Sequence, residues 1–522
     1  MRRLLYITLA IAVLLTPIVI VNFLLLPTTQ STLLNYVPFY NDELYHWHQS
    51  VSFMEAGFNS GYYTLNENIP LADYSHFYAW GAWVYALYGT LGNIFGFTLN
   101  SIMVFNLGFY LLAVILFILM TRPSFEGLIT TGFVLSTFIP LLLYIPSSML
   151  QVLNIAIAIV LASVLYLALT RPISWRLIVP ATIFIMAVSF IRPTYALYLP
   201  PLFALAYKKR TVKSTILSGF FALPLVLIAA VGFYISAAPF PHFRTLLFLG
   251  DDPLTVKLMN LGAYVQQSFI WMTQGASIVI GQRIMILTLI ILLIIWGIYR
   301  WRTRHSEHRI KNGDDDSQWG WELALHLYNL VGFYTATIVF HETLAGHDYR
   351  AMAYHFLLSL LLLVLFQRRA LYVPMIAMAF FLLPALAEEY NYKQPNFTDT
   401  VPRQFADWRS LMGDDIQYDP NAPSPWCNTV TTSAFYVLDA AGNPGMLLAI
   451  DPGIGLSWTF DWVFTDFDLP IPSEYKIPET FQSRYLILTD EDYNRFGQFL
   501  NLQRLERAPE GSLYLNLDAE CE

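Results

Sequence analysis

The sequence predicts a polytopic α-helical membrane protein that ends in a small water-soluble α/β domain. The 522-residue chain is 56% hydrophobic and only 13% charged, whereas soluble domains carry about 25% charged residues. Apolar runs of roughly 17–25 residues recur, and such lengths of helix cross a hydrocarbon core about 30 Å thick. Residues 388–522 hold 8 Lys/Arg and 22 Asp/Glu, a net charge of −14. The first 387 residues carry a net charge of +6, which gives the total of −8. The acidic tail is therefore predicted to be a separate soluble unit.

Basic residues predict the orientation of the chain, because short loops rich in Lys and Arg stay in the cytoplasm. Arg2 and Arg3 place the N-terminus inside, and the next basic residue is Arg122. Residues 27–76 hold five acidic residues and no Lys or Arg. We therefore expect this segment to lie outside the membrane.

Helices threaded between the basic clusters give about eleven membrane crossings. They are expected near residues 4–26, 100–120, 127–146, 149–170, 177–191, 194–207, 213–237, 284–299, 321–340, 351–367 and 371–387. Every basic cluster then lies on the inner side, and the odd number of crossings puts the acidic tail outside. The fifth and sixth spans are short and are split by Pro193, so one bent span there would change the count by one.

Two further apolar segments need separate interpretation. Residues 4–26 are too long for the core of a typical secretory signal, and no small-x-small cleavage site precedes Pro27, so we interpret them as a retained helix. Residues 77–97 are apolar but rich in Gly, Trp and Tyr. Because aromatic belts favour the membrane surface, an interfacial or re-entrant helix is expected there.

These spans divide the chain into two predicted domains. Residues 1–388 form a transmembrane domain with outer loops at 27–99 and 238–283, and residues 389–522 form an extracytoplasmic α/β domain. Strands of the tail are expected at 428–433, 446–450, 485–489 and 512–517, and a helix is expected to begin at Asp490 and end at Phe499. Cys427 and Cys521 both lie in the tail, where they form either a disulfide or two free thiols.

The first outer loop contains a dense acidic and aromatic motif, YNDELYHWHQS at residues 40–50. Asp42 and Glu43 stand beside His46 and His48, with no basic residue nearby. Carboxylates just outside a membrane helix are often simply solvated. Five aromatic residues around the pair argue for packing instead: Tyr40, Tyr45, Trp47, Phe53 and Phe58. A carboxylate that is partly desolvated by such neighbours has a raised pKa and is a better base.

Two arginines are expected on the same outer side. Arg192 opens the stretch RPTYALYLPPL at the end of one span, and Arg350 closes the loop HETLAGHDYR before another. A guanidinium group binds phosphate through its planar fork. Each arginine alone is explained by snorkelling toward lipid headgroups. Together with the carboxylates, they predict a site where one group accepts a proton and the arginines bind an anionic leaving group.

A divalent metal is an open alternative for this site. Its candidate ligands on the outer face are His46, His48, His76, His341, His347, Asp42 and Asp348. The chain contains no HExxH motif and no cysteine cluster, so ordinary interfacial histidines are favoured over metal ligands.

Four short motifs resemble those of a known superfamily. NDELYHW is similar to its acidic motif in the first outer loop, with Asp42 and Glu43 as the matching pair. The stretch from Ser75 onward, SHFYAWGAWVYALYG, leads to a helix in which Asn106 fills a motif position, although the usual Arg is absent. FIRPTYALYLPPL and HDYRAMAYHFLLSL resemble two later motifs. In the second of them, Ala351 replaces the usual Tyr and no Pro follows. In these motifs the chain resembles the GT-C superfamily of membrane glycosyltransferases, which includes protein O-mannosyltransferases and aminoarabinose transferases.

The resemblance implies a GT-C-like fold and an enzyme that takes a sugar from a polyprenyl-phosphate donor on the outer face. Asp42 would be the general base for the hydroxyl of a glycan, lipid or protein acceptor, and Glu43 would orient it or contact the acceptor. Arg192 and Arg350 would bind the donor phosphate, and the transfer would invert the anomeric configuration. The remaining candidates would contact or support the acceptor: His46, His48, His76 and Asp348.

Other functions remain as alternatives. No GxxxxGK[ST] loop or dinucleotide motif occurs, and nothing in the chain suggests a nucleic acid partner. A lipid-linked oligosaccharide flippase would show charges near the midplane and an internal repeat, which the sequence lacks. An O-antigen ligase or polymerase would use a large late outer loop, and only residues 238–283 are long enough. The last alternative is an inactive scaffold that binds a partner through its acidic tail.

Overall fold

The computed structural model describes most of the helical part of the chain and parts of the tail. The described ranges are 2–26, 81–98, 100–171, 174–206, 211–235, 277–306, 315–334, 348–392, 429–432, 436–438, 444–446, 455–458, 484–488, 490–495, 497–508 and 511–519, with short pieces between 33 and 74 and between 253 and 266. Asp42, His48, His76 and both cysteines lie outside the described residues.

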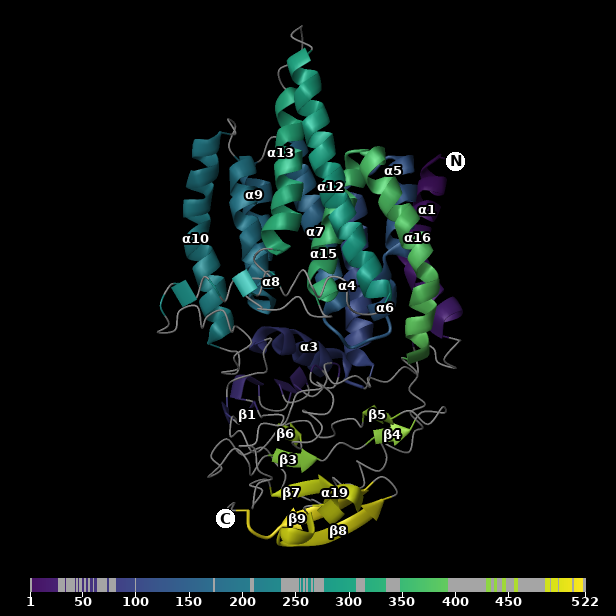
Figure 1. The fold of residues 1–522 in the computed structure, drawn as a ribbon, viewed down its shortest axis with the longest axis vertical. Coiled ribbons are helices and arrows are strands. Elements are labelled where there is room, and N and C mark those ends of the chain that lie inside the picture. Colours follow the sequence, from purple (N-terminus) through teal and green to yellow (C-terminus); the bar gives the residue numbers. More distant parts are fainter. Residues whose placement is uncertain are drawn as a thin grey trace.

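Most of the described chain forms a bundle of helices that run along the long axis of the molecule (Figure 1). They are α1 (Arg2–Ile20) with the π-helix η1 (Val21–Leu25), α4 (Ser101–Thr121), α5 (Phe125–Thr137), α6 (Ile139–Tyr144), α7 (Gln151–Thr170), α8 (Trp175–Ile191), the 3₁₀ helix η4 (Pro193–Tyr198), α9 (Leu199–Ala206), α10 (Val212–Tyr234), α12 (Ser277–Ser306), α13 (Asp315–Leu327) with the π-helix η6 (Tyr328–Gly332), α15 (Asp348–Leu365) and α16 (Arg369–Tyr392).

Six of the helices in the described residues are long and apolar enough to cross a membrane. They span Arg3–Leu25, Ser101–Thr121, Gln151–Thr170, Lys213–Phe233, Ile278–Thr303 and Arg369–Ala387. The chain is thus a multi-pass α-helical membrane protein. A helix lies in each of the eleven predicted ranges, but several are shorter than a full span, and the number of crossings stays a prediction.

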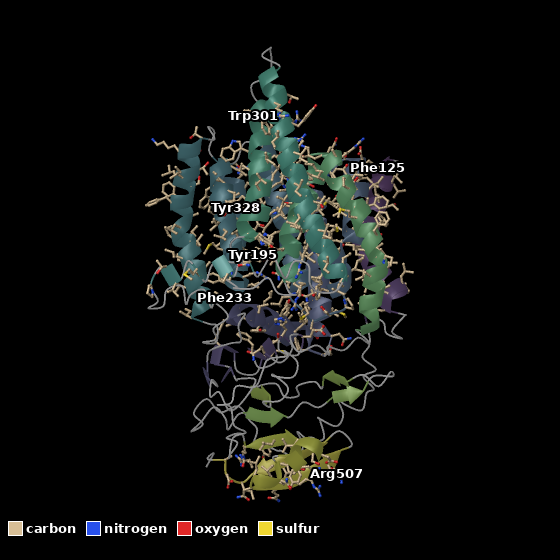
Figure 2. The ribbon with its side chains drawn as sticks, in the orientation of Figure 1. Phe125, Tyr195, Phe233, Trp301, Tyr328 and Arg507 are labelled. Carbon is tan, nitrogen blue, oxygen red and sulfur yellow. The ribbon has the colours of Figure 1, made fainter. Side chains whose placement is uncertain are left out.

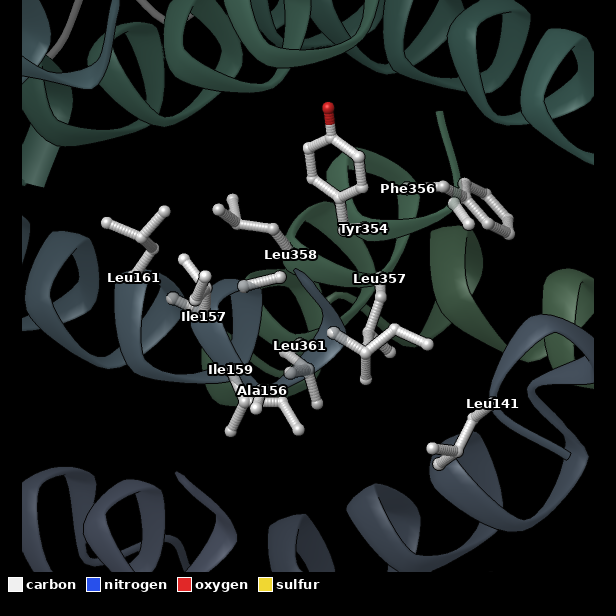
Figure 3. Close-up of a cluster of buried hydrophobic side chains, with 14 of the residues drawn as sticks. Leu141, Ala156, Ile157, Ile159, Leu161, Tyr354, Phe356, Leu357, Leu358 and Leu361 are labelled. Carbon is white, nitrogen blue, oxygen red and sulfur yellow. The ribbon is translucent and has the colours of Figure 1, made fainter. Parts of the chain in front are cut away.

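The helix α7 forms the centre of the bundle. Its sequence is apolar on every side, which is typical of a helix buried all round, and 89% of its span is buried. Figure 3 shows Ile157 and Leu161 of α7 beside Leu358 of α15. By contrast, only 22% of the span in α10 is buried, and its large side chains such as Phe220 project outward. The outer helices therefore present an apolar surface suited to lipid.

Contacts between distant segments define one end of the bundle, here called the basic end. The Tyr6 hydroxyl donates to the carbonyl of Pro123 at 3.1 Å, and Arg369 forms an ion pair with Glu126 at 2.5 Å. Arg368 forms a bidentate pair with Glu322, with distances of 2.9 and 2.7 Å. The N-terminus lies at this end (Figure 1).

The opposite end of the bundle is covered by α3 (Ala82–Phe95), which lies across the other helices (Figure 1). Gly81 and Gly96 flank it with φ of 69° and 84°, backbone conformations that glycine adopts without strain. At Gly89 an added Cβ would lie 2.8 Å from Cδ1 of Phe53, so α3 packs closely against that segment. The crosswise orientation is the one expected of the predicted interfacial helix.

The described part of the tail contains a five-stranded sheet with the order β6-β3-β7-β9-β8. Its strands are β3 (Thr429–Thr432), β6 (Gly455–Trp458), β7 (Tyr485–Leu488), β8 (Leu502–Ala508) and β9 (Gly511–Asn516). β3 pairs in parallel with β6 and β7, whereas β9 is antiparallel to β7 and β8. Leu486, Leu488 and Tyr514 form a small core beside the helix α19 (Asp490–Arg495).

Two short antiparallel strand pairs complete the described strands: β1 (Gly61–Tyr62) with β2 (Asp73–Tyr74), and β4 (Tyr436–Leu438) with β5 (Pro444–Met446). The sheet lies beyond α3, at the far end of the molecule from the N-terminus (Figure 1). The acidic first loop and the tail are therefore on the same side of the bundle.

Candidate active site

The structure describes only part of the predicted site. The positions of Glu43, His46, Arg192, Arg350 and the backbone of Asp348 are described, whereas those of Asp42, His48 and His76 are not. The described side chains of the predicted site are therefore those of Glu43, His46, Arg192 and Arg350.

Glu43 is buried, with 1% of its surface exposed. Its Oε1 accepts a hydrogen bond of 2.8 Å from the backbone N–H of Ser148, which lies between α6 and α7. A hydrogen bond to a charged group is among the stronger ones in proteins. Glu43 is thus packed against the bundle and does not belong to a solvated loop.

His46 is also buried, and it packs under α3. Its Nδ1 lies 3.4 Å from the hydroxyl of Tyr85, and its backbone carbonyl accepts a hydrogen bond of 2.6 Å from Ser50. These contacts fix the segment that carries the acidic pair against the end of the bundle.

The turn between α6 and α7 is fixed by Asn106 of α4. The Asn106 amide donates to the carbonyl of Met149 at 2.9 Å, and its Oδ1 accepts from the hydroxyl of Tyr88 at 2.6 Å. Because Ser148 directly precedes Met149 in this turn, the anchor of Glu43 is held by α3 and α4 together. The sequence motif had marked Asn106 without revealing this structural role.

Arg192 follows α8 and lies on the ring of Tyr354. Its guanidinium carbon is 4.9 Å from the ring centroid, within the range of a cation–π contact. Tyr354 lies one helical turn after Arg350 on α15, so both share one face of that helix. Arg192 therefore packs on Tyr354, and Arg350 lies one turn earlier on the same helix; both arginines are half-buried.

The first turn of α7 connects the arginines with the acidic segment. The hydroxyl of Tyr195 donates to Oδ1 of Asn154 at 2.8 Å, and its ring lies 5.5 Å from that of Tyr354. Asn154 lies six residues after Ser148, the anchor of Glu43. One buried carboxylate and one stacked guanidinium thus lie around the same helix terminus.

Sequence reasoning missed Ser148, Asn154 and Tyr354, although each contacts a predicted residue or its neighbour. Asn154 carried a usable signal, because a polar side chain inside an apolar span is costly and often functional. Ser148 acts through its backbone N–H, which no sequence pattern distinguishes.

Within the described residues, no group of three His, Cys, Asp or Glu side chains could hold a metal ion. His46, one of the candidate ligands, contacts the hydroxyl of Tyr85. Most other candidate ligands lie outside the described residues, and a metal stays an untested alternative.

No protein-family model matches the chain, and no curated protein does. Solved structures similar to it include apo ArnT from Cupriavidus metallidurans, with 12% identity, full coverage of both chains and a TM-score of 0.40. Arabinofuranosyltransferase AftD from Mycobacteria is 12% identical over the whole of this chain and 42% of its own, with a TM-score of 0.47. The Archaeoglobus fulgidus oligosaccharyltransferase complex with Zn and sulfate is 14% identical over 97% and 73%, with a TM-score of 0.44.

At identities of 12–14%, the roles of individual residues rest on the contacts within this chain.

Proposed function

We propose that the protein is a membrane glycosyltransferase that moves a sugar from a polyprenyl-phosphate donor to an acceptor hydroxyl. The observation that supports this function is the gathering of Glu43 and the Arg192–Tyr354 pair around the start of α7. A carboxylate segment suits proton removal, and guanidinium groups suit a phosphate leaving group.

In the proposed reaction, the carboxylate of Asp42 takes the proton of the acceptor hydroxyl. The acceptor oxygen then attacks the anomeric carbon, and the bond from that carbon to the phosphate oxygen breaks. The products are a glycoside of inverted configuration and a polyprenyl phosphate. One positioned base accelerates such a step by about 10²–10⁴-fold.

Glu43 and the arginines have distinct proposed roles. Glu43 is adjacent to Asp42 and anchored to Ser148, so it fixes the backbone that carries the base. Arg192 and Arg350 would stabilise the charge that develops on the leaving phosphate. The ring of Tyr354 packs against the Arg192 guanidinium and fixes its position.

The proposal includes the arrangement of the chain in the membrane. The basic end would face the cytoplasm, and α3 and the tail would lie outside, with a domain boundary near residues 388 and 389. The lipid donor would enter from the bilayer, and a glycan, lipid or protein acceptor would enter from the aqueous side.

The test is transfer by purified protein from a panel of polyprenyl-phosphate and polyprenyl-pyrophosphate sugars. Asp42→Asn should insert normally and lose transfer by at least about 10²-fold. Glu126→Gln is the matched control, because this exposed carboxylate pairs with Arg369 at the basic end. Its transfer should equal that of the wild type. Full turnover by Asp42→Asn would remove the base, and transport of lipid-linked sugar without transfer would favour a flippase.

A further inference from the structure

Four buried polar side chains, here called the Asn329 cluster, join η4, η6 and α15. The members are Tyr198, Asn329, His355 and Ser359. The Tyr198 hydroxyl donates to Oδ1 of Asn329 and lies 2.6 Å from Nδ1 of His355. The Asn329 amide donates to the carbonyl of His355 at 2.6 Å and to Oγ of Ser359 at 2.7 Å.

One assignment of protons satisfies the cluster. The single hydroxyl proton of Tyr198 goes to Asn329 Oδ1, and Nδ1–H of His355 then donates to the Tyr198 oxygen. The Asn329 amide uses both of its protons and its oxygen. A cluster with every member paired is rigid and selects one arrangement of its helices.

The surroundings make this cluster unusual. Two of its members, His355 and Ser359, lie within the apolar stretch Met352–Leu365 of α15, where polar side chains are costly and usually functional. Asn329 also lies in the π-helix η6, directly after α13. Such π-helical turns are rare in proteins, and those that occur are often found at functional sites. The extra residue in the turn shifts the side chains that follow by about 100° around the axis.

The cluster connects the two elements that carry the arginines of the proposed site. Tyr198 ends η4, which begins directly after Arg192. His355 follows Tyr354, the ring on which Arg192 lies, and Arg350 is one turn earlier. Figure 2 shows Tyr195 of η4 and Tyr328, the neighbour of Asn329, within the bundle, and Tyr328 donates to the carbonyl of Leu197 at 2.6 Å.

We propose that Asn329 is a positioning residue that holds Arg192 and Arg350 in register to bind the donor phosphate. This inference rests on the proposed function, and it adds a residue from a third helix, 131 positions after Tyr198. If the cluster only stabilised the bundle, its removal would lower the stability of the protein without a selective effect on donor binding.

The test compares Asn329→Leu and Tyr198→Phe with the wild type in full-length purified protein. Leucine has the same branched shape as asparagine but forms no hydrogen bond, so the arginines should lose their register. We expect the KM for the polyprenyl-phosphate donor to rise about tenfold, with an unchanged acceptor KM. Inhibition by free polyprenyl phosphate should weaken by the same factor.

The double variant gives an internal check. Because Asn329 and Tyr198 belong to one cluster, the combined loss should be smaller than the product of the two single losses. Tyr6→Phe is the matched control, since it removes one tyrosine hydrogen bond at the basic end. Its donor KM should equal that of the wild type.

Direct binding of polyprenyl phosphate without a sugar separates this inference from the proposed function. Weaker binding by a folded Asn329→Leu variant supports the positioning role, even if no sugar in the panel is transferred. Wild-type affinity in that variant, or equal losses for donor and acceptor together with a lower melting temperature, would overturn it.

Discussion

At the residue scale, the central feature is a buried carboxyl group that is hydrogen-bonded to a backbone N–H. Glu43 accepts from the Ser148 N–H, and the Asn106 contacts hold the same turn. Sequence reasoning placed the acidic pair in a packed environment from its aromatic neighbours, and Glu43 agrees. It could not identify the partner, because a backbone N–H has the same chemistry at every residue except proline.

Glu43→Gln should keep the fold, because the glutamine oxygen still accepts from Ser148. Glu43→Ala should lower the free energy of unfolding by about 1–3 kcal/mol more, since it leaves a buried N–H without an acceptor. Thermal unfolding in detergent measures both. Equal destabilisation by the two variants would show that the Ser148 contact does not hold this segment.

Arg192→Lys should weaken the donor affinity about tenfold, although the charge is kept. Lysine lacks both the planar surface that lies on Tyr354 and the bidentate fork for phosphate. Tyr354→Leu should weaken donor affinity as much as Arg192→Lys does. Tyr354→Phe keeps the ring, so its donor KM should stay within a factor of about three of the wild-type value. The donor KM of each variant is the measurement. A wild-type donor KM for Arg192→Lys would contradict the proposed role of the contact between Arg192 and Tyr354.

At the element scale, hydrophobic length and pattern predicted the helices well, and the uniformly apolar sequence of α7 is that of a central helix. The tail was harder. β8 was missed because LQRLERA is an edge strand with exposed charged residues, which gives no alternation of apolar positions. Of the predicted strand at 446–450, only Met446 lies within the described residues, where it ends β5. The π-helix η6 has no sequence signature, so the orientation of Asn329 was unpredictable.

Truncation of core side chains should separate α7 from the outer helices. Leu161→Ala in α7 should cost about 2–5 kcal/mol of stability, because the side chain is fully buried. Ile216→Ala in α10 should change little, because that side chain is 69% exposed. Thermal unfolding of the two variants, both truncated to alanine, gives the comparison. Similar losses would contradict the outer position of α10.

At the scale of the whole molecule, the two ends of the bundle differ in chemistry. The basic end gathers ion pairs of Arg368 and Arg369, and the other end gathers Glu43 and Arg192, which lies on Tyr354. Charge distribution predicted which segments share a side. It could not show how Arg192, Arg350 and Glu43 approach α7, because that depends on packing between residues more than a hundred positions apart.

Single cysteines in a background without Cys427 and Cys521 should report this orientation. Gln498→Cys in the tail should react with a membrane-impermeant thiol reagent in intact cells, because we expect the tail outside. Thr303→Cys near the end of α12 should react only after the membrane is opened. The reverse pattern would invert the proposed topology.

The most direct test of the proposed site is a structure of the protein with polyprenyl phosphate bound. The account predicts phosphate oxygens within hydrogen-bond distance of Arg192 and Arg350, and the segment of Asp42 and Glu43 facing the space where a sugar would stand. A phosphate bound at the basic end, or on the lipid-facing surface of α10, would contradict it.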